Sequence, residues 1–395
     1  MRVDLTQRPA TELIELYRRR EASPVEVTTA VLGRIEALDD VLNAFCLVAA
    51  DEAMDSARVS EQRWQRGAPV GPLDGVPTCL KDLLLTRGWP TRRGSRTVDL
   101  DQPWDTDAPV TARLREAGAV LIGKTTTPEF GCKAETNSPL TGLTRNPWDP
   151  AKSPGGSSGG TAVAVAAGLG PLGVGTDGAG SVRIPAAFCG NVGFKPSFGR
   201  VPAYPLSPFG TVSHIGPHTM SVADAALMLN VLKQPDPRDW TSLPPDASDL
   251  RVGLEDGVAG LRVAYSPTLG YARVDAEVAA AVEVAVGELA SLGAVVEVVD
   301  PGFEDPLEIT TGLWFTGAWT LWNTLTPEQQ AVTDPDFTAQ AELGAALTNL
   351  DVQRLQLRRG ELGSLMRRFM TRYDLLVTPA VAIPRSRPGL LATPR

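Results

Sequence analysis

Serines in two glycine-rich stretches are the residues of this sequence best suited to nucleophilic chemistry. Residues 154–160 read Pro-Gly-Gly-Ser-Ser-Gly-Gly, and residues 175–185 read Gly-Thr-Asp-Gly-Ala-Gly-Ser-Val-Arg-Ile-Pro. A serine hydroxyl is a weak nucleophile and needs an adjacent base to remove its proton. Glycine clusters also mark turns and phosphate-binding loops, so neither stretch alone identifies a catalytic site.

Histidine and cysteine offer few alternatives to serine. A histidine-based triad or metal centre would have to use His214 or His218, the two histidines of the chain, and both are predicted to be polar loop positions. The four cysteines are far apart in the sequence and form no C-x-x-C pair: Cys46, Cys79, Cys132 and Cys189. This spacing favours reduced thiols over a disulfide framework or a zinc site.

A third motif accompanies the two serine-containing stretches. Residues 71–82 read Gly-Pro-Leu-Asp-Gly-Val-Pro-Thr-Cys-Leu-Lys-Asp. Together the three motifs resemble the amidase signature family of serine hydrolases. The resemblance runs from the N-terminal helices to residues 373–379 and includes residues 145–148 and 188–190. Three separated motifs in the right order over most of the chain make a specific signal.

The resemblance implies a Ser-cisSer-Lys catalytic set. Ser181 matches the nucleophile, Ser157 matches the bridging serine that follows a cis peptide bond, and Lys81 matches the base. A lysine acts as a base only when neutral, and at an ordinary pKa of about 10.4 only on the order of one in a few thousand is neutral at pH 7. Burial disfavours the ammonium form and lowers the pKa, so this site must be desolvated.

The nucleophile loop is also expected to stabilise the developing oxyanion. By resemblance, the hole consists of four backbone N–H groups, those of Gly178, Ala179, Gly180 and Ser181. The family usually has Thr-Gly-Gly-Ser here, so Ala179 is expected to adopt a conformation that glycine usually fills. Asp177 and Arg183 are predicted to brace the loop from behind, with an ordinary surface ion pair as the alternative.

Alternating helices and strands must position these loops. A helix over residues 107–118 precedes an apolar strand at 119–122, and a strand at 261–265 is followed by a helix ending at Gly293 and a strand at 294–299. This pattern predicts parallel strands joined by right-handed crossovers. A bare P-loop match at residues 118–125 is rejected because strand-like residues fill the supposed loop.

The resemblance implies an α/β fold of the amidase signature type, with a mixed, largely parallel sheet covered by helices on both faces. We expect a single domain over residues 1–395, with a helical packing region at 1–65, and a proline-rich surface loop at 233–257 in preference to a domain linker. Residues 161–176 are predicted to form a buried helix and strand, since glycines interrupt them too often for a membrane span.

The chain is expected to be short at its C-terminal end. Family members usually continue past the Val-Thr-Pro strand at residues 377–379 into further strands of the sheet, whereas this chain stops at residue 395. Missing strands would leave apolar surface and an unpaired edge exposed. The sequence therefore predicts lowered stability, a homo-oligomer that covers the gap, or a truncated chain.

Composition narrows the functional classes. The chain is 43% hydrophobic and 21% charged, which excludes overall disorder, and its net charge of −9 argues against direct nucleic-acid binding. The N-terminus lacks the apolar segment of a secretory signal, so we expect a cytoplasmic protein that does not bind membranes. The expected partner is a small-molecule amide, and no metal or organic cofactor is expected.

The preferred function is hydrolysis of a carboxylic amide, to an acid and ammonia or an amine, through an acyl-Ser181 intermediate. Two alternatives remain open: the glutaminase subunit of a tRNA-dependent amidotransferase, and a catalytically impaired amidase-like binding protein. Phe315, Trp319 and Trp322 have helical spacing and are predicted to face the core, with an aromatic substrate pocket as the alternative.

Overall fold

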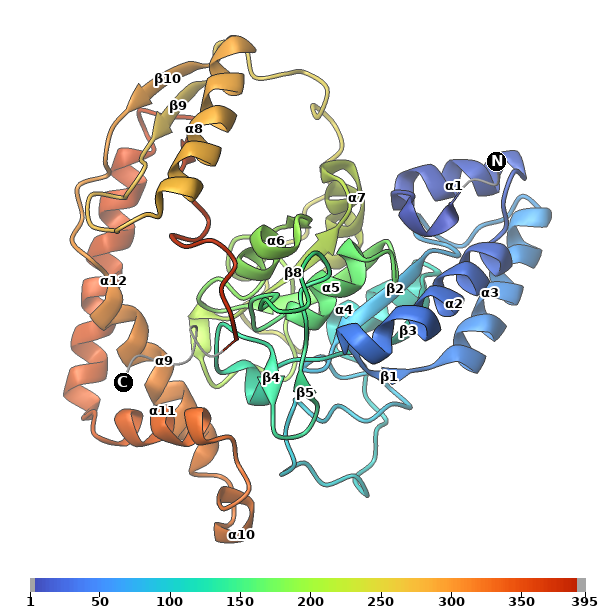
Figure 1. Cartoon of the computed structure of the whole chain (residues 1–395), viewed down its shortest axis with the longest axis horizontal. Coiled ribbons are helices and arrows are strands. Elements are labelled where there is room, and N and C mark those ends of the chain that lie inside the picture. The colour runs from blue at the N-terminus through green and yellow to red at the C-terminus, as the bar shows by residue number, and fades with distance from the viewer. Residues whose placement is uncertain (1–3, 389–395) are drawn as a thin grey trace. The chain divides into compact units, whose positions relative to one another are not determined.

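The structure is a computed structural model that describes residues 4–388. The backbone groups into two compact units (Figure 1). Among the described residues, the first contains 4–251, Leu325–Thr338 and 387–388, and the second contains Val252–Thr324 and Ala339–Ser386. The single domain over residues 1–395 stays a prediction, because the chain passes between the units several times and one folding domain can contain both.

The N-terminal region is mostly helical. Its helices are α1 (Ala10–Arg19), α2 (Pro24–Leu42) and α3 (Ala50–Gln65), preceded by the short η1 (Leu5–Gln7). A capping box begins α2, in which the Ser23 hydroxyl accepts from the Glu26 N–H and the Glu26 carboxylate accepts from the Ser23 N–H. One feature was not predicted: Phe45–Val48 forms the strand β1, which joins the edge of the main sheet.

The main sheet of the first unit has the order β1-β3-β2-β6-β8-β7. Its further strands are β2 (Pro77–Lys81), β3 (Val120–Thr125), β6 (Leu172–Asp177), β7 (Val192–Gly193) and β8 (His214–Thr219). The central strands β3, β2 and β6 are parallel, and β1, β8 and β7 pair antiparallel. Every residue of β2 and β3 is buried, so both faces of the sheet centre are covered. The α/β class with a mixed sheet is confirmed, although parallel pairing is confined to the centre of this sheet.

Helices of the first unit enclose this sheet (Figure 1). They include α4 (Pro109–Glu116), α5 (Gly159–Ala166), α6 (Arg183–Cys189) and α7 (Val222–Leu232). The unit also contains the short α10 (Pro327–Gln330), the turns η2 (Glu129–Gly131) and η3 (Gly210–Val212), and the small hairpin of β4 (Asn137–Ser138) and β5 (Gly142–Leu143). The predicted buried helix and strand at 161–176 correspond to α5 and β6. Residues 120–125 form the strand β3 and not a phosphate-binding loop, which agrees with the rejection of the P-loop match at 118–125.

The second unit has a parallel three-stranded sheet, in the order β10-β9-β11. Its elements are β9 (Arg262–Tyr265), α8 (Ala276–Ser291), β10 (Val295–Val298), α9 (Leu307–Trp322), α12 (Asn349–Phe369) and β11 (Leu375–Val377), with α11 (Pro335–Ala345) beginning in the first unit and continuing into the second. The predicted strand-helix-strand pattern around Gly293 is confirmed as β9, α8 and β10.

The aromatic residues of α9 differ from the prediction. The buried residues of this helix are Ile309, Gly312, Leu313, Gly317 and Ala318, whereas Phe315, Trp319 and Trp322 are only half-buried. Because α9 is apolar around most of its circumference, spacing alone did not identify the buried face. The prediction of an aromatic core stripe was therefore wrong.

The predicted loop at 233–257 contains no helix or strand, and the division between the two units falls within it, after Arg251. Among residues 4–388, none of the helices has the length and apolar character required to cross a membrane. The edge strand β10 exposes Val295 and Val298. Lowered stability and oligomerisation remain predictions from the sequence.

Candidate active site

Lys81 is the last residue of β2, and its side chain is completely buried. Its Nζ lies 2.7 Å from the Ser157 Oγ, 3.0 Å from the Ser158 Oγ and 2.9 Å from the Thr176 Oγ1. Burial lowers the pKa of Lys81 well below its usual value, and the negative charge of Asp177 opposes this only in part. The desolvated lysine that the sequence required is therefore present, and it contacts hydroxyl groups.

Ser158 and Thr176 were not predicted as neighbours of Lys81. The Ser158 hydroxyl donates to the Thr176 carbonyl (3.1 Å) and accepts from the Thr176 N–H (3.2 Å). Because a hydroxyl has one hydrogen, Ser158 can only accept from Lys81. When Lys81 is neutral, its lone pair must therefore face Ser157 or Thr176. Both residues lie in the glycine-rich motifs, but side-chain direction cannot be read from a motif.

Ser157 follows a cis peptide bond from Gly156, as the resemblance implied. The backbone is crowded at Gly156, where a Cβ would lie 2.6 Å from the Glu135 N. The turn η2 also approaches Ser157 closely: a Cβ on Gly131 would lie 3.2 Å from the Ser157 Oγ, and Gly131 has φ +73°. Glycine at position 156 therefore permits the close approach of the Glu135 backbone, and glycine at position 131 leaves space beside the Ser157 hydroxyl.

Ser181 lies in the loop between β6 and α6, and it is 8% exposed. The Ser158 N–H donates to the Ser181 carbonyl at 3.1 Å, so the two serine-containing loops are in contact. The left-handed backbone conformation of this loop occurs at Gly180, with φ +109°, and not at Ala179. The expected strain at Ala179 is thus absent, because the glycine that the conformation requires is the next residue.

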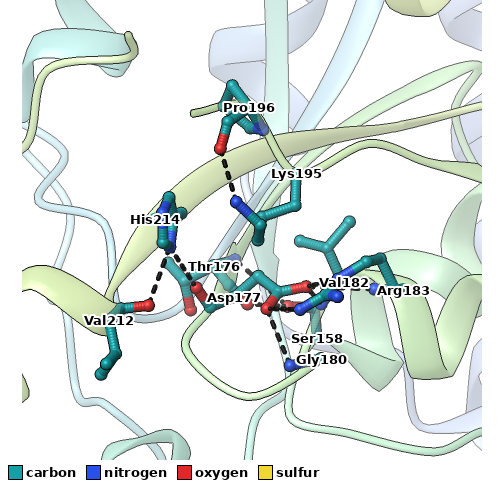
Figure 2. Close-up of polar contacts among 10 residues, drawn as sticks. All are labelled: Ser158, Thr176, Asp177, Gly180, Val182, Arg183, Lys195, Pro196, Val212 and His214. Carbon is teal, nitrogen blue, oxygen red and sulfur yellow. Dashed lines mark hydrogen bonds and ion pairs between the residues drawn. The ribbon is translucent and has the colours of Figure 1, made fainter. Parts of the chain in front are cut away.

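Asp177 organises the nucleophile loop (Figure 2). Its carboxylate accepts from the N–H groups of Gly180 (2.8 Å) and Val182 (3.1 Å) and forms a two-point ion pair with Arg183, at 2.9 Å to Nε and 2.8 Å between Oδ1 and a terminal nitrogen. Burial raises the pKa of Asp177, but the hydrogen bonds and charge of Arg183 and the two N–H groups bring it down to about 2. The Asp177 carboxylate thus connects the start of the loop with Gly180, Val182 and Arg183.

The backbone N–H groups of the nucleophile loop differ in whether they already donate a hydrogen bond within the protein. The Gly180 N–H, one of the four predicted oxyanion donors, already donates to Asp177. Within residues 4–388, the N–H groups of Gly178, Ala179 and Ser181 donate no hydrogen bond. Three of the four predicted donors therefore have no acceptor in the described residues, whereas Gly180 already has one, and the oxyanion role of this loop stays a prediction.

Comparison with known proteins decides the family. The model of the Amidase family matches residues 26–393, nearly the whole chain. The chain belongs to the Amidase family. It is therefore an amidohydrolase that acts on amide C–N bonds, and the amidase signature fold is confirmed.

Relatives of this amidase include hydrolases and amidotransferase subunits. An acylamidase of Rhodococcus erythropolis is 39% identical over 377 residues, which cover 94% of this chain and 79% of the relative. A glutamyl-tRNA(Gln) amidotransferase subunit of Chloroflexus aurantiacus is 42% identical over 276 residues, which cover 70% of this chain and 56% of the relative. The matched region thus spans little more than half of the length of the amidotransferase relative.

Solved structures agree with this fold. A bacterial aryl acylamidase of the amidase signature family superimposes with a TM-score of 0.90 and 32% identity, over 98% of this chain and 82% of the other. A 6-aminohexanoate cyclic dimer hydrolase complexed with substrate gives a TM-score of 0.88 and 30% identity, over 98% of this chain and 82% of the other.

Both histidines of this amidase lie in the strand β8, which corrects the prediction of loop positions. His218 is fully buried, and burial lowers its pKa to about 3. Its Nδ1 lies 3.1 Å from the Asn191 Oδ1. His214 pairs across the sheet with Asp177. The Gly-Pro pair at 216–217 is typical of a turn, so the sequence did not indicate a strand at these positions.

An acidic segment holds the loop that lies beside Ser157. The buried Lys133, two residues after Gly131, forms ion pairs of 2.8 Å with both Asp334 and Asp336. Glu129 accepts from the Ser95 hydroxyl at 2.6 Å and from the Asp334 N–H. The partners are about 200 positions apart in the sequence, so no local pattern could have predicted this contact.

Proposed function

We propose that Lys81, Ser157 and Ser181 form the catalytic relay of this amidase and that Ser181 is acylated during turnover. As Ser181 attacks the carbonyl carbon of an amide, its proton passes to Ser157, which in turn gives its own proton to neutral Lys81. The tetrahedral intermediate collapses when the relay runs backward and Ser157 protonates the leaving nitrogen. Amine or ammonia departs, and the acyl group remains on Ser181.

Water completes the reaction along the same path. It attacks the acyl-Ser181 carbonyl while Ser157 and Lys81 accept its proton, and the proton then returns to Ser181 as the carboxylic acid leaves. We assign oxyanion stabilisation to the N–H groups of Gly178, Ala179 and Ser181, because these donors have no protein acceptor in the described residues. Asp177 and Arg183 would keep these groups in place without contacting the substrate.

One observation supports this proposal more than any other. The Nζ of Lys81 is fully buried and 2.7 Å from the Ser157 hydroxyl, while its nearest partners are hydroxyl groups and not carboxylates. A carboxylate partner would hold the lysine in its charged form, which cannot accept a proton. Hydroxyl partners in a desolvated site leave the neutral base accessible.

The direct test is Ser181→Ala assayed on a panel of short aliphatic amides, aromatic amides and glutamine. We expect kcat to fall by roughly 10³-fold or more, as for other residues that act as a catalytic unit. Ser364→Ala, at an exposed serine of α12 outside the proposed relay, serves as the matched control and should retain activity. Turnover by Ser181→Ala at the wild-type rate would overturn the assignment.

The relatives support a small-molecule carboxylic amide as substrate, since an acylamidase and an aryl acylamidase are among them. The amidotransferase relatives favour glutamine as a second candidate, with the partner protein that this reaction needs. The same panel distinguishes these: ammonia release confined to glutamine, together with copurification of a second protein chain, would select the amidotransferase function. A cytoplasmic location remains a prediction from the sequence.

A further inference from the structure

A cavity of about 140 Å³ lies in the first unit beside residues 196–215. Most of its lining is apolar, from Phe198, Val201, Ala203, Leu206, Ile215 and Trp240. Lys81, Ser157 and Ser181 do not line it, so it is distinct from the proposed relay. Trp240 is 82% exposed, and the cavity therefore reaches the surface.

The size and lining of this cavity fit one aromatic ring. An apolar cavity of about 150 Å³ stays dry and can hold a benzene molecule. The one carboxylate in the lining, Asp239, is already satisfied: it accepts from the Ala203 N–H at 2.8 Å and from the Thr241 N–H and hydroxyl at 2.8 and 2.6 Å. Asp239 therefore does not call for a cationic ligand.

His214 is one of the lining residues, and one of its two ring nitrogens has no hydrogen-bond partner within the described residues. Its Nδ1 lies 2.8 Å from the Val212 carbonyl and 3.2 Å from the Asp177 carbonyl (Figure 2), so Nδ1 carries the hydrogen. Burial and the charge of Lys195 lower the pKa of His214, which keeps the ring neutral at pH 7. In this tautomer Nε2 is an acceptor, and no residue between 4 and 388 donates to it.

We propose that this cavity binds a monocyclic aromatic molecule with one hydrogen-bond donor, such as a phenol or an arylamine, and that the donor contacts the Nε2 of His214. The apolar lining encloses the ring, while the free nitrogen selects rings with an O–H or N–H group. This proposal does not rest on the assignment of the catalytic relay, because it concerns a separate cavity.

The cavity is connected to the nucleophile loop through a single side chain. The ring of His214 contacts the proposed ligand on one side and donates to the carbonyl of Asp177 on the other. Asp177 in turn holds Gly180 and Val182. The aromatic molecule can be the leaving group of an aryl amide substrate or a separate molecule, and kinetics distinguishes these two sources.

Calorimetric titration of the full chain at pH 7 with phenol and with toluene tests the proposal. We expect saturable binding of one phenol per chain, with an affinity roughly 2- to 10-fold higher than for toluene, because toluene lacks the donor. Absence of saturable phenol binding, or equal affinities for the two rings, would overturn it. Binding is measured without turnover, so its failure is distinct from a failure of the Ser181→Ala test.

Two variants show where the ring binds. Ala203→Phe fills the cavity and should abolish binding of both probes, whereas the control Ala151→Phe, at an exposed position, should bind them as the wild type does. His214→Phe retains a ring but removes the acceptor, so phenol should lose its advantage over toluene. Phenol binding by a folded Ala203→Phe protein at wild-type affinity would refute the location.

The source of the ring follows from the effect of phenol on amide hydrolysis. If the cavity binds the leaving group of an aryl amide, phenol raises KM for that substrate and leaves kcat unchanged. If it binds a separate molecule, phenol leaves KM unchanged, and any effect on kcat arises through Asp177. Either outcome requires that saturable phenol binding has first been measured by calorimetry. The kinetic result then shows whether the natural ligand is the substrate's leaving group or a separate molecule.

Discussion

At the scale of single residues, burial has two effects on Lys81. It keeps the amine neutral, so that the amine can act as a base, and it lowers the free energy of unfolding at pH values where the unfolded chain is protonated at this residue. Its pKa is far below the usual lysine value because the ammonium form is desolvated. The unfolded chain therefore binds a proton at this residue over a pH range in which the folded chain does not. By linkage, the free energy of unfolding rises with pH between the lowered pKa and about 10.4, the unfolded value.

Lys81→Met should therefore remove activity and stabilise the fold. We expect the variant to have a higher free energy of unfolding at pH 7 than the wild type, and to lose the part of the pH dependence that arises from Lys81. Urea unfolding at pH 7 and pH 9 measures both. Lys152→Met is the control, and an unchanged stability and pH slope in Lys81→Met would contradict a buried neutral lysine.

Gly131→Ala tests the space beside Ser157. The added Cβ would lie 3.0 Å from the Leu83 Cδ1 and 3.2 Å from the Ser157 Oγ, in a left-handed conformation. Gly67 has a similar φ of +67° with nothing within 4 Å of its Cβ position, so Gly67→Ala is the matched control. Both variants should lose about 1–2 kcal/mol of stability for the backbone conformation, and only Gly131→Ala should lose kcat. Equal kcat values in the two would show that Gly131 does not constrain Ser157.

At the scale of elements, the loop between β6 and α6 depends on one carboxylate. Because hydrogen bonds and the Arg183 charge lower the pKa of Asp177 to about 2, its contribution to stability is complete above the unfolded value near 3.8 and is lost as the pH falls toward 2. The same contacts fix the loop that contains Ser181. Stability and catalysis should therefore change together at this residue.

Asp177→Asn should lower kcat roughly 10-fold or more, because a displaced loop misplaces the nucleophile and the N–H donors. It should also lower the free energy of unfolding by about 1–3 kcal/mol, through weakened buried hydrogen bonds. Steady-state kinetics and urea unfolding at pH 7 measure the two effects. Arg183→Lys keeps the positive charge but loses the two-point ion pair with Asp177. Its kcat and its free energy of unfolding should therefore lie between those of the wild type and those of Asp177→Asn. A fully active Asp177→Asn would contradict the bracing role.

The sequence predicted contacts that short motifs encode and missed those that depend on distant partners. The family resemblance implied the cis bond at Ser157, while the burial of Lys81 and the Asp177–Arg183 pair were expected from residues within one strand or loop. The contacts of Lys133 with Asp334 and of β1 with β3 join distant segments, and no local pattern specifies them. For α9, uniform apolarity left the buried face undetermined.

At the scale of the whole molecule, each of the two units is built from segments that are separated in the sequence. The chain leaves the first unit after residue 251, returns at 325 and leaves again after 338. Residues 325–338 are anchored within the first unit by Lys133 and Glu129. Unfolding of the second unit would release constraints at both ends of this segment.

We therefore expect a single cooperative unfolding transition, as a single domain would show. Far-ultraviolet circular dichroism and tryptophan fluorescence should give the same midpoint in urea. Lys133→Met, which removes the anchor within the first unit, should separate the two curves. Two distinct transitions in the wild-type protein would contradict the single-domain prediction.

The central claim is that a buried, neutral Lys81 is the base for Ser181, and the pH dependence of kcat/KM for a small amide tests it most directly. The ascending limb reports the essential base of the free enzyme. We predict its midpoint well below the usual lysine value of 10.5, with no such limb in the residual activity of Lys81→Met. An ascending limb near 10.5, or the same limb retained in Lys81→Met, would contradict the relay.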